Sequence, residues 1–295
     1  MKKILTLFCI AMLLTSQVPF LEGQSRTGSS PAPGGRTQGF FNDAFSNLED
    51  AFDDSGYTLE DAYYLGRAVA ANVIAFYKPY TGNPDLTGYL NRICQTLVIN
   101  TPEAVTFNGF HVIILDSPEF NAFASPGGHL FLTRGLVELC TSEDMLAALL
   151  AHEIAHVLLK HGIAIIEEMK FSNDMATSAR RGAELTGNSE AARRALQYRE
   201  SVASIVDAMI KNGYSQTQEF EADAVAVTLL ANSGYNPGAL REVLQVLQKV
   251  QSSQKGGFNT THPSPAERLS RAESAINRYQ VQDTRSYRTP RFKNK

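Results

Sequence analysis

Two histidines and a glutamate carry the clearest chemistry in this chain of 295 residues. They occur in the stretch LLAHEIAHVLL, in which His152 and His156 are four residues apart and Glu153 directly follows the first histidine. On a helix such residues lie one turn apart on one face, so both imidazoles can bind the same zinc ion. Glu153 then stands within reach of a water molecule beside the metal. The pattern predicts a catalytic zinc site with Glu153 as general base.

The surroundings of this pattern strengthen the prediction. Apart from these three side chains, every residue from Met145 to Leu159 is apolar. Such a helix is buried on nearly all sides, where charged and imidazole groups are costly unless they are paired or bind a metal. His161 lies five residues after His156, about 140° round a continuous helix, and we expect it to end the helix. A metzincin would need a third histidine at the position of Gly162, so that class is excluded.

A third ligand is needed, because a catalytic zinc ion has three protein ligands and one open position. The segment Gln216 to Asn232 is otherwise apolar and helical in pattern, and it carries Glu219 and Asp223 four residues apart. Glu219 can complete the zinc site, and Asp223 can accept the second N–H of a ligand histidine and fix its tautomer. Glu221 falls on a different face of this helix. The alternative is that Glu219 only complements the helix dipole.

Several longer segments resemble a known family, the gluzincin peptidases of the HtpX and BepA type, which also includes the CAAX prenyl endopeptidases. The segments are LNRICQTLV (90–98), NAFASPGGHLFLTRGLV (121–137), HEIAH (152–156), EFEAD (219–223), GYNPGAL (234–240) and THPSPAERL (261–269). The resemblance implies that His152, His156 and Glu219 bind one Zn²⁺ per chain and that Glu153 is the catalytic base. Family members commonly carry Ser-Arg ahead of the glutamate ligand, whereas here Ser215 is followed by Gln216.

The resemblance also indicates where a substrate lies. It implies that the segment around Asn121 to Leu132 supplies the strand for a substrate peptide, with Asn121, Gly128, His129 and Leu130 as its candidate residues. Backbone groups of residues 128–131 would then hydrogen-bond an extended substrate as an added strand, which favours broad or conformational specificity. Taken by themselves, His111 and His129 are expected to be structural.

Two residues near the end of the similar region have open roles. The resemblance implies that His262 approaches the metal from the loop before the last helix, where it would hold the resting enzyme inactive if it displaced the water. The alternative is a plain turn in the sequence THPSP. Arg268 is expected to bind either a substrate carbonyl or structural carboxylates.

The elements that must position these side chains are mostly helical. The pattern predicts helices from Thr58, as N-cap, to about residue 77 and from Pro84 to Ile99, and strands over residues 107–115 and 128–133. From Ser142 the chain is helical in pattern almost to Tyr279. The expected fold is α+β and mainly helical, a zincin-like metallopeptidase domain with a small β-sheet next to the HExxH helix.

The chain divides into four expected parts. Residues 1–23, with Lys2 and Lys3 before an apolar run, are typical of a signal peptide. Residues 24–57 are expected to be a linker, residues 58–280 the peptidase domain and residues 281–295 a basic flexible tail. Cys94 and Cys140 are either a disulfide pair or two buried thiols.

The amino-acid composition and net charge limit the kinds of molecule that the protein is expected to bind. With 43% hydrophobic residues and a formal net charge of -3, the chain can bury a large core and has no basic excess for nucleic acid. No segment after the signal has 18 uninterrupted apolar residues, so no transmembrane span is expected. The protein is expected to be exported and periplasmic, the periplasm resting on the resemblance, as a short, stand-alone family member.

These expectations combine into one function and one alternative. The function is a zinc-dependent metalloendopeptidase that hydrolyses misfolded or unfolded envelope proteins in protein quality control, with the outer-membrane assembly machinery as a candidate partner. The alternative is a self-inhibited, chaperone-like assembly factor with little proteolysis. A purely structural zinc protein is disfavoured, because structural zinc sites have four cysteine or histidine ligands and no adjacent base.

Overall fold

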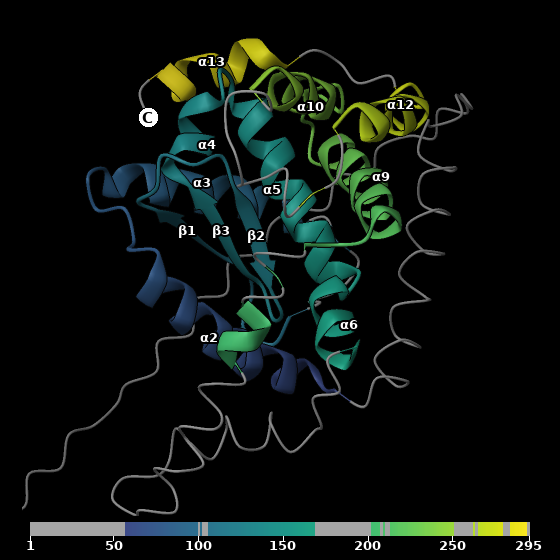
Figure 1. The fold of residues 1–295 in the computed structure, drawn as a ribbon. Coiled ribbons are helices and arrows are strands. Elements are labelled where there is room, and N and C mark those ends of the chain that lie inside the picture. Colours follow the sequence, from purple (N-terminus) through teal and green to yellow (C-terminus); the bar gives the residue numbers. More distant parts are fainter. Residues whose placement is uncertain are drawn as a thin grey trace, which may run out of the picture.

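The computed structural model describes residues 57–99, 101, 106–168, 202–206, 209, 213–250, 262, 265–279 and 284–293. Its elements run in the order α2 (Leu59–Phe76), α3 (Pro84–Val98), β1 (His111–Leu115), β2 (Ala122–Ser125), β3 (His129–Thr133), α4 (Arg134–Leu139), α5 (Glu143–Leu158), α6 (His161–Glu168), α9 (Gln216–Asn232), α10 (Ala239–Val250), α12 (Pro265–Ile276) and α13 (Arg285–Lys293). Helices surround a small sheet beside α5, which carries the HExxH pattern (Figure 1). This architecture confirms the expected fold class.

The first two helices begin at the expected residues. The side chain of Thr58 accepts a hydrogen bond from the N–H of Asp61, whose carboxylate accepts one from the N–H of Thr58. Together they form a capping box at the start of α2. Pro84 is at the first position of α3, with Asn83 as N-cap. The signal segment 1–23 and residues 24–56 of the expected linker lie outside the described residues, but Tyr57 is only 4% exposed and belongs to the folded domain.

The sheet has three strands in the order β1-β3-β2. The central strand β3 pairs in parallel with β1 and antiparallel with β2. Strand β1 begins at His111, four residues later than expected. Strand β2 was not recognised as a separate strand, because its sequence AFAS contains no β-branched residue.

Both faces of this sheet are covered. Along β3, Leu130 and Leu132 belong to the apolar cluster that includes α5, whereas Phe131 belongs to a second cluster that includes α2. Successive side chains of a strand point to opposite faces, so the alternation places one cluster on each side. The sheet is therefore an interior layer of the molecule.

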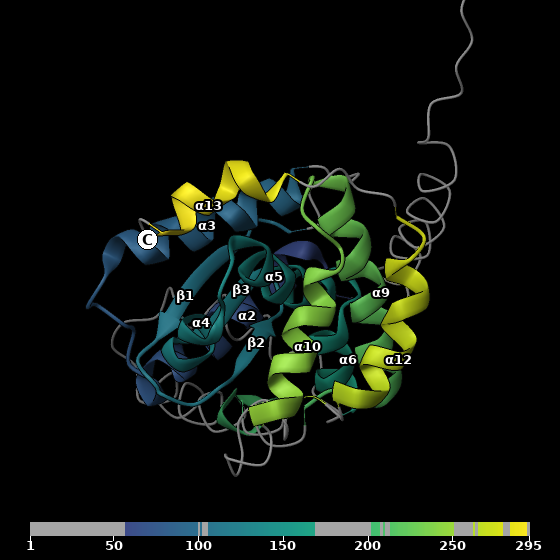
Figure 2. The same ribbon diagram turned by 90° about the horizontal axis from the view of Figure 1, so that it is seen from above.

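Helix α5 lies in the interior of the domain. Every residue of α5 except Val157 is buried, including the three residues of the HExxH pattern. Seen from above, the sheet and α3 lie on one side of α5, and α9, α10 and α12 lie on the other (Figure 2). A helix enclosed in this way can hold polar side chains only where other elements supply partners for them.

The turn between β2 and β3 packs tightly against α2. Gly127 and Gly128 have φ angles of +74° and +96°, which L side chains rarely adopt. On the facing helix, a Cβ on Gly66 would lie 1.7 Å from the carbonyl oxygen of Pro126. Glycine at these positions therefore permits the close approach of the two backbones.

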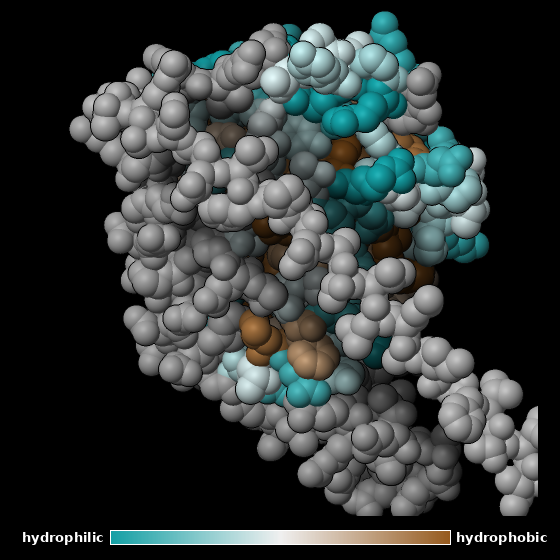
Figure 3. Space-filling model, turned by 180° about the vertical axis from the view of Figure 1, so that it is seen from behind, coloured by the Kyte–Doolittle hydropathy of each residue, from teal (hydrophilic) through white to brown (hydrophobic). Residues whose placement is uncertain are grey.

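The C-terminal segment differs from the flexible tail that was expected. Residues 285–293 form α13, which lies across the end of the molecule where α5 begins (Figure 1). Arg288 of α13 is buried and binds Asp144, and Arg291 binds Glu143. Hydrophilic side chains gather along this end of the molecule in the view from behind (Figure 3). The segment is ordered by ion pairs, which hydrophobic periodicity does not reveal.

Two further expectations concern cysteines and membranes. Within the described part of the chain, Cys94 and Cys140 are both buried and no disulfide joins them, so the buried-thiol alternative holds. Among the described helices, none alone is long and apolar enough to cross a membrane. Only α5 and α6 taken together, across a bend of 45°, meet that criterion by length and composition.

Candidate metal centre

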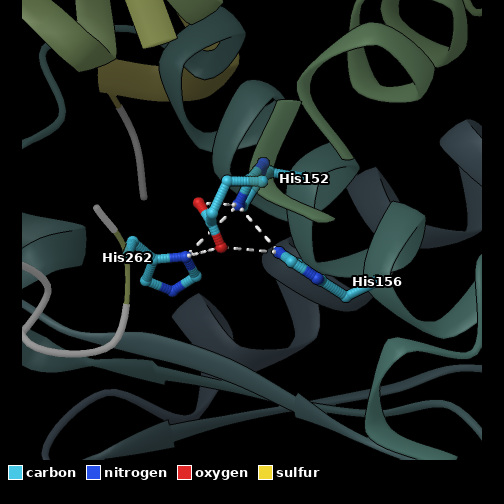
Figure 4. A group of neighbouring side chains, drawn as sticks. His152, His156 and His262 are labelled. Carbon is cyan, nitrogen blue, oxygen red and sulfur yellow. Dashed lines mark hydrogen bonds and ion pairs between the residues drawn. The ribbon is translucent and has the colours of Figure 1, made fainter. Parts of the chain in front are cut away.

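Four buried side chains from three parts of the chain converge on one point. His152 and His156 come from α5, Glu219 from the first turn of α9, and His262 from the residues before α12. One ligand atom from each lies within 4.8 Å of the others. The three imidazoles point toward a shared centre in Figure 4. The structure thus brings together all three residues expected to bind zinc, together with His262, for which the resemblance implied an approach to the metal.

The distances between these atoms fit a small cation. His152 Nε2 lies 3.0 Å from His156 Nε2 and 3.4 Å from Glu219 Oε2, and His156 Nε2 lies 3.3 Å from Glu219 Oε1. A tetrahedron whose corners lie about 2.0–2.1 Å from its centre has edges of about 3.3–3.4 Å. His262 Nδ1 lies 3.4 Å from His152 Nε2 and 2.7 Å from Glu219 Oε1. Both oxygens of Glu219 take part in these contacts, and the 2.7 Å between His262 Nδ1 and Glu219 Oε1 is a hydrogen-bond distance, so the contacts among His152, His156 and Glu219 come closest to the edges of a tetrahedral site.

Glu153 stands beside this cluster without a hydrogen bond. Both of its carboxylate oxygens are buried and have no hydrogen-bond partner among the described residues, and the residue is only 1% exposed. Its nearest ion-pair partner is His262 Nε2, at 3.9 Å from Oε1. Burial raises the pKa of the Glu153 carboxyl above its usual value. A raised pKa and unused lone pairs suit a group that accepts and returns a proton.

A buried arginine and a second carboxylate support the cluster. Arg268 donates from Nε and Nη2 to the two oxygens of Asp223 at 2.8 and 2.6 Å, and its Nη1 lies 2.9 Å from Glu219 Oε2. Of the two partners considered for Arg268, the structure places carboxylates against it. Asp223 Oδ1 also lies 3.1 Å from His152 Nδ1, the nitrogen that faces away from the cluster. This contact matches the tautomer-fixing position expected for Asp223.

The electrostatics of the cluster favour a cation. Burial and Arg268 lower the pKa of His152, but Glu219 and Asp223 outweigh them and raise it to about 9. Burial lowers the pKa of His156 far below its usual value, so this imidazole is neutral. A pKa of about 9 means that His152 holds a proton while no metal is bound, and a metal ion must displace this proton to bind Nε2. Once His152 is neutral, the ionised carboxylates of Glu153, Glu219 and Asp223 leave two negative charges that Arg268 does not compensate. A divalent cation at the centre would neutralise them, so the residues fit a metal ion.

His161 and Glu221 were not expected near the site. His161 Nδ1 lies 2.9 Å from His156 Nδ1, and His161 Nε2 lies 3.3 Å from Glu221 Oε2. The expectation that His161 ends the helix is wrong, since α5 ends at Leu158 and His161 begins α6. Lys160 has a φ of 56°, and this residue turns the chain between the two helices. Gly162 was the one sequence signal for a break at this place.

The expected substrate strand requires a correction. His129 and Leu130 begin β3, the central strand, whose main chain is already paired on both sides, and the carbonyl of Gly128 just before it accepts from the His111 N–H. An added strand cannot bind there. The edge strand near α5 is β2, which begins directly after Asn121. The carbonyl of Asn121 accepts a hydrogen bond from the N–H of Thr133, so this carbonyl faces β3.

Main-chain groups of an antiparallel strand alternate in direction. Those of Ala122 and Ala124 therefore face away from β3, toward the candidate metal centre. His262 Nε2 lies 3.3 Å from the carbonyl oxygen of Ala122, and the hydroxyl of Tyr214 donates to that of Ala124 at 3.3 Å. The ring of Tyr214 also stacks on His156 with centroids 3.8 Å apart. Two side chains of the protein thus occupy the free edge of β2.

A small cleft lies beside this edge. It is lined by His156 and Tyr214 from the site, by Ala124 to Gly127 at the end of β2, and by apolar residues of α2 and α6. His129 lies away from it on the other side of the turn, stacked against Tyr63 at 5.6 Å between ring centroids.

The arrangement of an HExxH helix, a glutamate from a second helix and a small sheet beside them is that of a gluzincin peptidase. Residues 84–276 match the model of peptidase family M48. The chain belongs to this family. At the position where the resemblance led us to expect an arginine, Gln216 donates a hydrogen bond to Glu267.

Several named relatives are similar over most of the chain. It is 27% identical over 241 residues to the beta-barrel assembly-enhancing protease of Escherichia coli K12, covering 79% of this chain and 49% of the relative. It is 30% identical over 210 residues to the same-named protein of Yersinia pestis, covering 70% and 42%. The mitochondrial metalloendopeptidase OMA1 of Schizosaccharomyces pombe is 25% identical over 197 residues, covering 66% and 54%. The chain spans about half the length of these relatives.

Proposed function

We propose that the protein is a zinc-dependent metalloendopeptidase that hydrolyses unfolded or misfolded proteins of the cell envelope. The observation that carries the proposal is a cluster of four buried ligand residues beside a buried glutamate whose carboxylate makes no hydrogen bond among the described residues, next to the edge strand β2. Zinc is a metal that a set of imidazole and carboxylate ligands favours.

The residues divide the work of hydrolysis between them. A zinc ion held by His152, His156 and Glu219 would polarise the peptide carbonyl and make a water molecule more acidic. Glu153 accepts the proton of the attacking water at a carboxylate oxygen and delivers it to the nitrogen of the leaving amine. Asp223 and Arg268 hold the ring of His152 and the carboxylate of Glu219 in place.

The substrate binds to β2 as an added antiparallel or parallel strand. The main-chain groups of Ala122 and Ala124 would pair with an extended segment, which folded proteins rarely expose. Recognition through main-chain groups favours unfolded segments over a particular sequence. The names of the beta-barrel assembly-enhancing proteases support a role at the envelope, as does the expected signal segment.

His262 regulates the same site. Its Nδ1 occupies the fourth corner of the ligand set and its Nε2 contacts the carbonyl of Ala122 on the substrate edge. In the resting enzyme His262 therefore blocks both the open position of the metal and part of the peptide site. The position of His262 at the metal site and on the edge of β2 also supports the alternative function, an assembly factor with little proteolysis.

The test uses one protein substrate in native form and in reduced, unfolded form, with products mapped by mass spectrometry. The wild type is expected to cleave the unfolded form within extended segments and to leave the native form intact. His262→Ala is expected to cleave faster, and the control His111→Ala, at an exposed position on β1, is expected to match the wild type. Equal cleavage of both forms would contradict strand addition, and an unchanged rate in His262→Ala would contradict the resting-state role of His262.

A further inference from the structure

A histidine outside the ligand set touches one of its members. His161, the first residue of α6, is only 4% exposed, and its Nδ1 lies 2.9 Å from Nδ1 of His156. The two rings meet edge to face, with centroids 5.0 Å apart. The turn at Lys160 brings His161 back beside the last turn of α5, so the contact depends on the break between the two helices.

The hydrogen positions in this contact follow from the direction of His156. Its Nε2 faces the cluster and must offer a lone pair to a metal, so its proton is on Nδ1. That N–H can only donate to an unprotonated Nδ1 of His161. The proton of His161 is then on Nε2, which lies 3.3 Å from Glu221 Oε2 and donates to it. In this series of hydrogen bonds, the tautomer of His156 fixes the tautomer of His161.

The same logic accounts for the acids of α9. Glu219 is a member of the ligand cluster, and Asp223 accepts from Nδ1 of His152. Glu221 lies between them on another face of the helix, with its side chain 53% exposed, and reaches the second histidine through His161. Each of the three acids in EFEAD thus faces one of the histidines that surround the site.

We propose that His161 and Glu221 are positioning residues for His156, holding its ring orientation and tautomer as Asp223 does for His152. The inference rests on the proposed zinc site. His161 binds neither metal nor substrate in this account, and it acts only through His156. Groups that hold a ligand histidine in this way typically contribute about 10- to 100-fold to metal affinity.

Four variants of the full chain separate this role from simple packing. His161→Leu keeps an apolar side chain but removes the acceptor, whereas His161→Asn retains an acceptor near the position of Nδ1. Glu221→Gln removes the charge at the end of the chain of hydrogen bonds. Glu138→Gln, on an exposed glutamate of α4 far from the site, is the matched control. Thermal melts of each variant establish that it is folded.

The first readout is the zinc dissociation constant, measured by competition with a chromophoric chelator. The expected result is a 10- to 100-fold weakening in His161→Leu, a smaller loss in Glu221→Gln and in His161→Asn, and none in the control. The double variant His161→Leu/Glu221→Gln is expected to bind zinc as His161→Leu does, because Glu221 acts only through His161.

The second readout is the tautomer of His156, from long-range ¹H–¹⁵N spectra of the imidazoles. The wild type is expected to show an exchange-protected Nδ1 proton on His156, and His161→Leu is expected to lose that protection. Equal zinc affinity in wild type and His161→Leu, with an unchanged tautomer, would overturn the inference while leaving the peptidase proposal intact. A wild type that binds no zinc would overturn both.

Discussion

The ion pair between Asp144 and Arg288 offers a sharp test of how α13 is attached. Arg288 donates to both oxygens of Asp144, at 3.0 Å from Nε and 2.7 Å from Nη2, and both residues are buried. In Arg288→Met the carboxylate keeps the N–H of Asn236, at 2.9 Å, but loses its counter-charge. Removing one member of a buried pair costs about 3–5 kcal/mol. For a domain of this size that lowers Tm by roughly 6–20 °C.

The assay is unfolding by heat and by urea, with a matched control on the same helix. Arg285 pairs with Glu242 at the surface, where the two side chains are 44% and 38% exposed. Arg285→Met is therefore expected to cost only about 0–1 kcal/mol. Adding Asp144→Asn to Arg288→Met should recover part of the loss, because the unpaired charge is removed. Equal destabilisation by the two arginine variants would refute the reasoning and would mean that α13 is not held by this pair.

Three further changes have defined outcomes. Gly66→Ala would place a Cβ against the carbonyl of Pro126 and is expected to lower the free energy of unfolding, measured by urea denaturation, by about 1–3 kcal/mol. Gly88→Ala, whose Cβ would meet only a flexible side chain, should raise it by up to about 1 kcal/mol. Zinc at about 1,000 times its dissociation constant should add about 4 kcal/mol to the unfolding free energy, and a chelator should remove that gain; a Tm insensitive to zinc would contradict a metal site. Tyr214→Phe keeps the ring but frees the carbonyl of Ala124 for substrate, so KM should fall by about 2- to 12-fold; a rise in KM would show that the hydroxyl helps binding.

The ligand residues were predictable because their signals are local. Residues four apart on a helix share a face, so the spacings of His152 with His156 and of Glu219 with Asp223 already placed each pair together. Polar side chains in an otherwise apolar, buried helix also indicate that they have hydrogen-bond, ion-pair or metal partners. Long-range packing was needed only to bring the two helices side by side.

His161 and Glu221 escaped prediction because a straight helix was assumed. On such a helix the five-residue spacing from His156 turns His161 away from the metal. One left-handed residue, Lys160, breaks the helix and brings His161 back against Nδ1 of His156. The conformation of a single non-glycine residue at φ 56° is set by tertiary packing and has no clear signal in the sequence.

The order of the strands in the sheet could not be predicted from the sequence either. Periodicity identified the β3 segment as a strand, but it does not say which strand is central and which is at the edge. The pairing of β2 is set by the turn at Gly127 and by contacts with α5. For this reason the expected segment, residues 121–132, included both β2 and β3, and the main-chain pairing was assigned to residues 128–131 although β3 is the central strand.

The sequence contained a signal that the C-terminal segment is ordered, but the prediction did not use it. Glu143 and Asp144 begin a helix that is apolar almost throughout, so two buried carboxylates had to find partners elsewhere in the chain. The basic segment after residue 283 carries the arginines that bind them, roughly 145 residues away along the sequence. Buried acids without a local partner therefore predict a distant basic segment better than hydrophobic periodicity does.

The most direct test of the central claim is the zinc content of the purified protein together with hydrolysis of an unfolded protein, in wild type and Glu153→Gln. The account predicts one zinc per chain in both, and a rate lower by roughly 10²- to 10⁴-fold in the variant, because the ligands are intact and only the proton acceptor is lost. The control Glu138→Gln should match the wild type. Zinc in both proteins with equal hydrolysis would contradict the role of Glu153, and no zinc in either would contradict the metal centre itself.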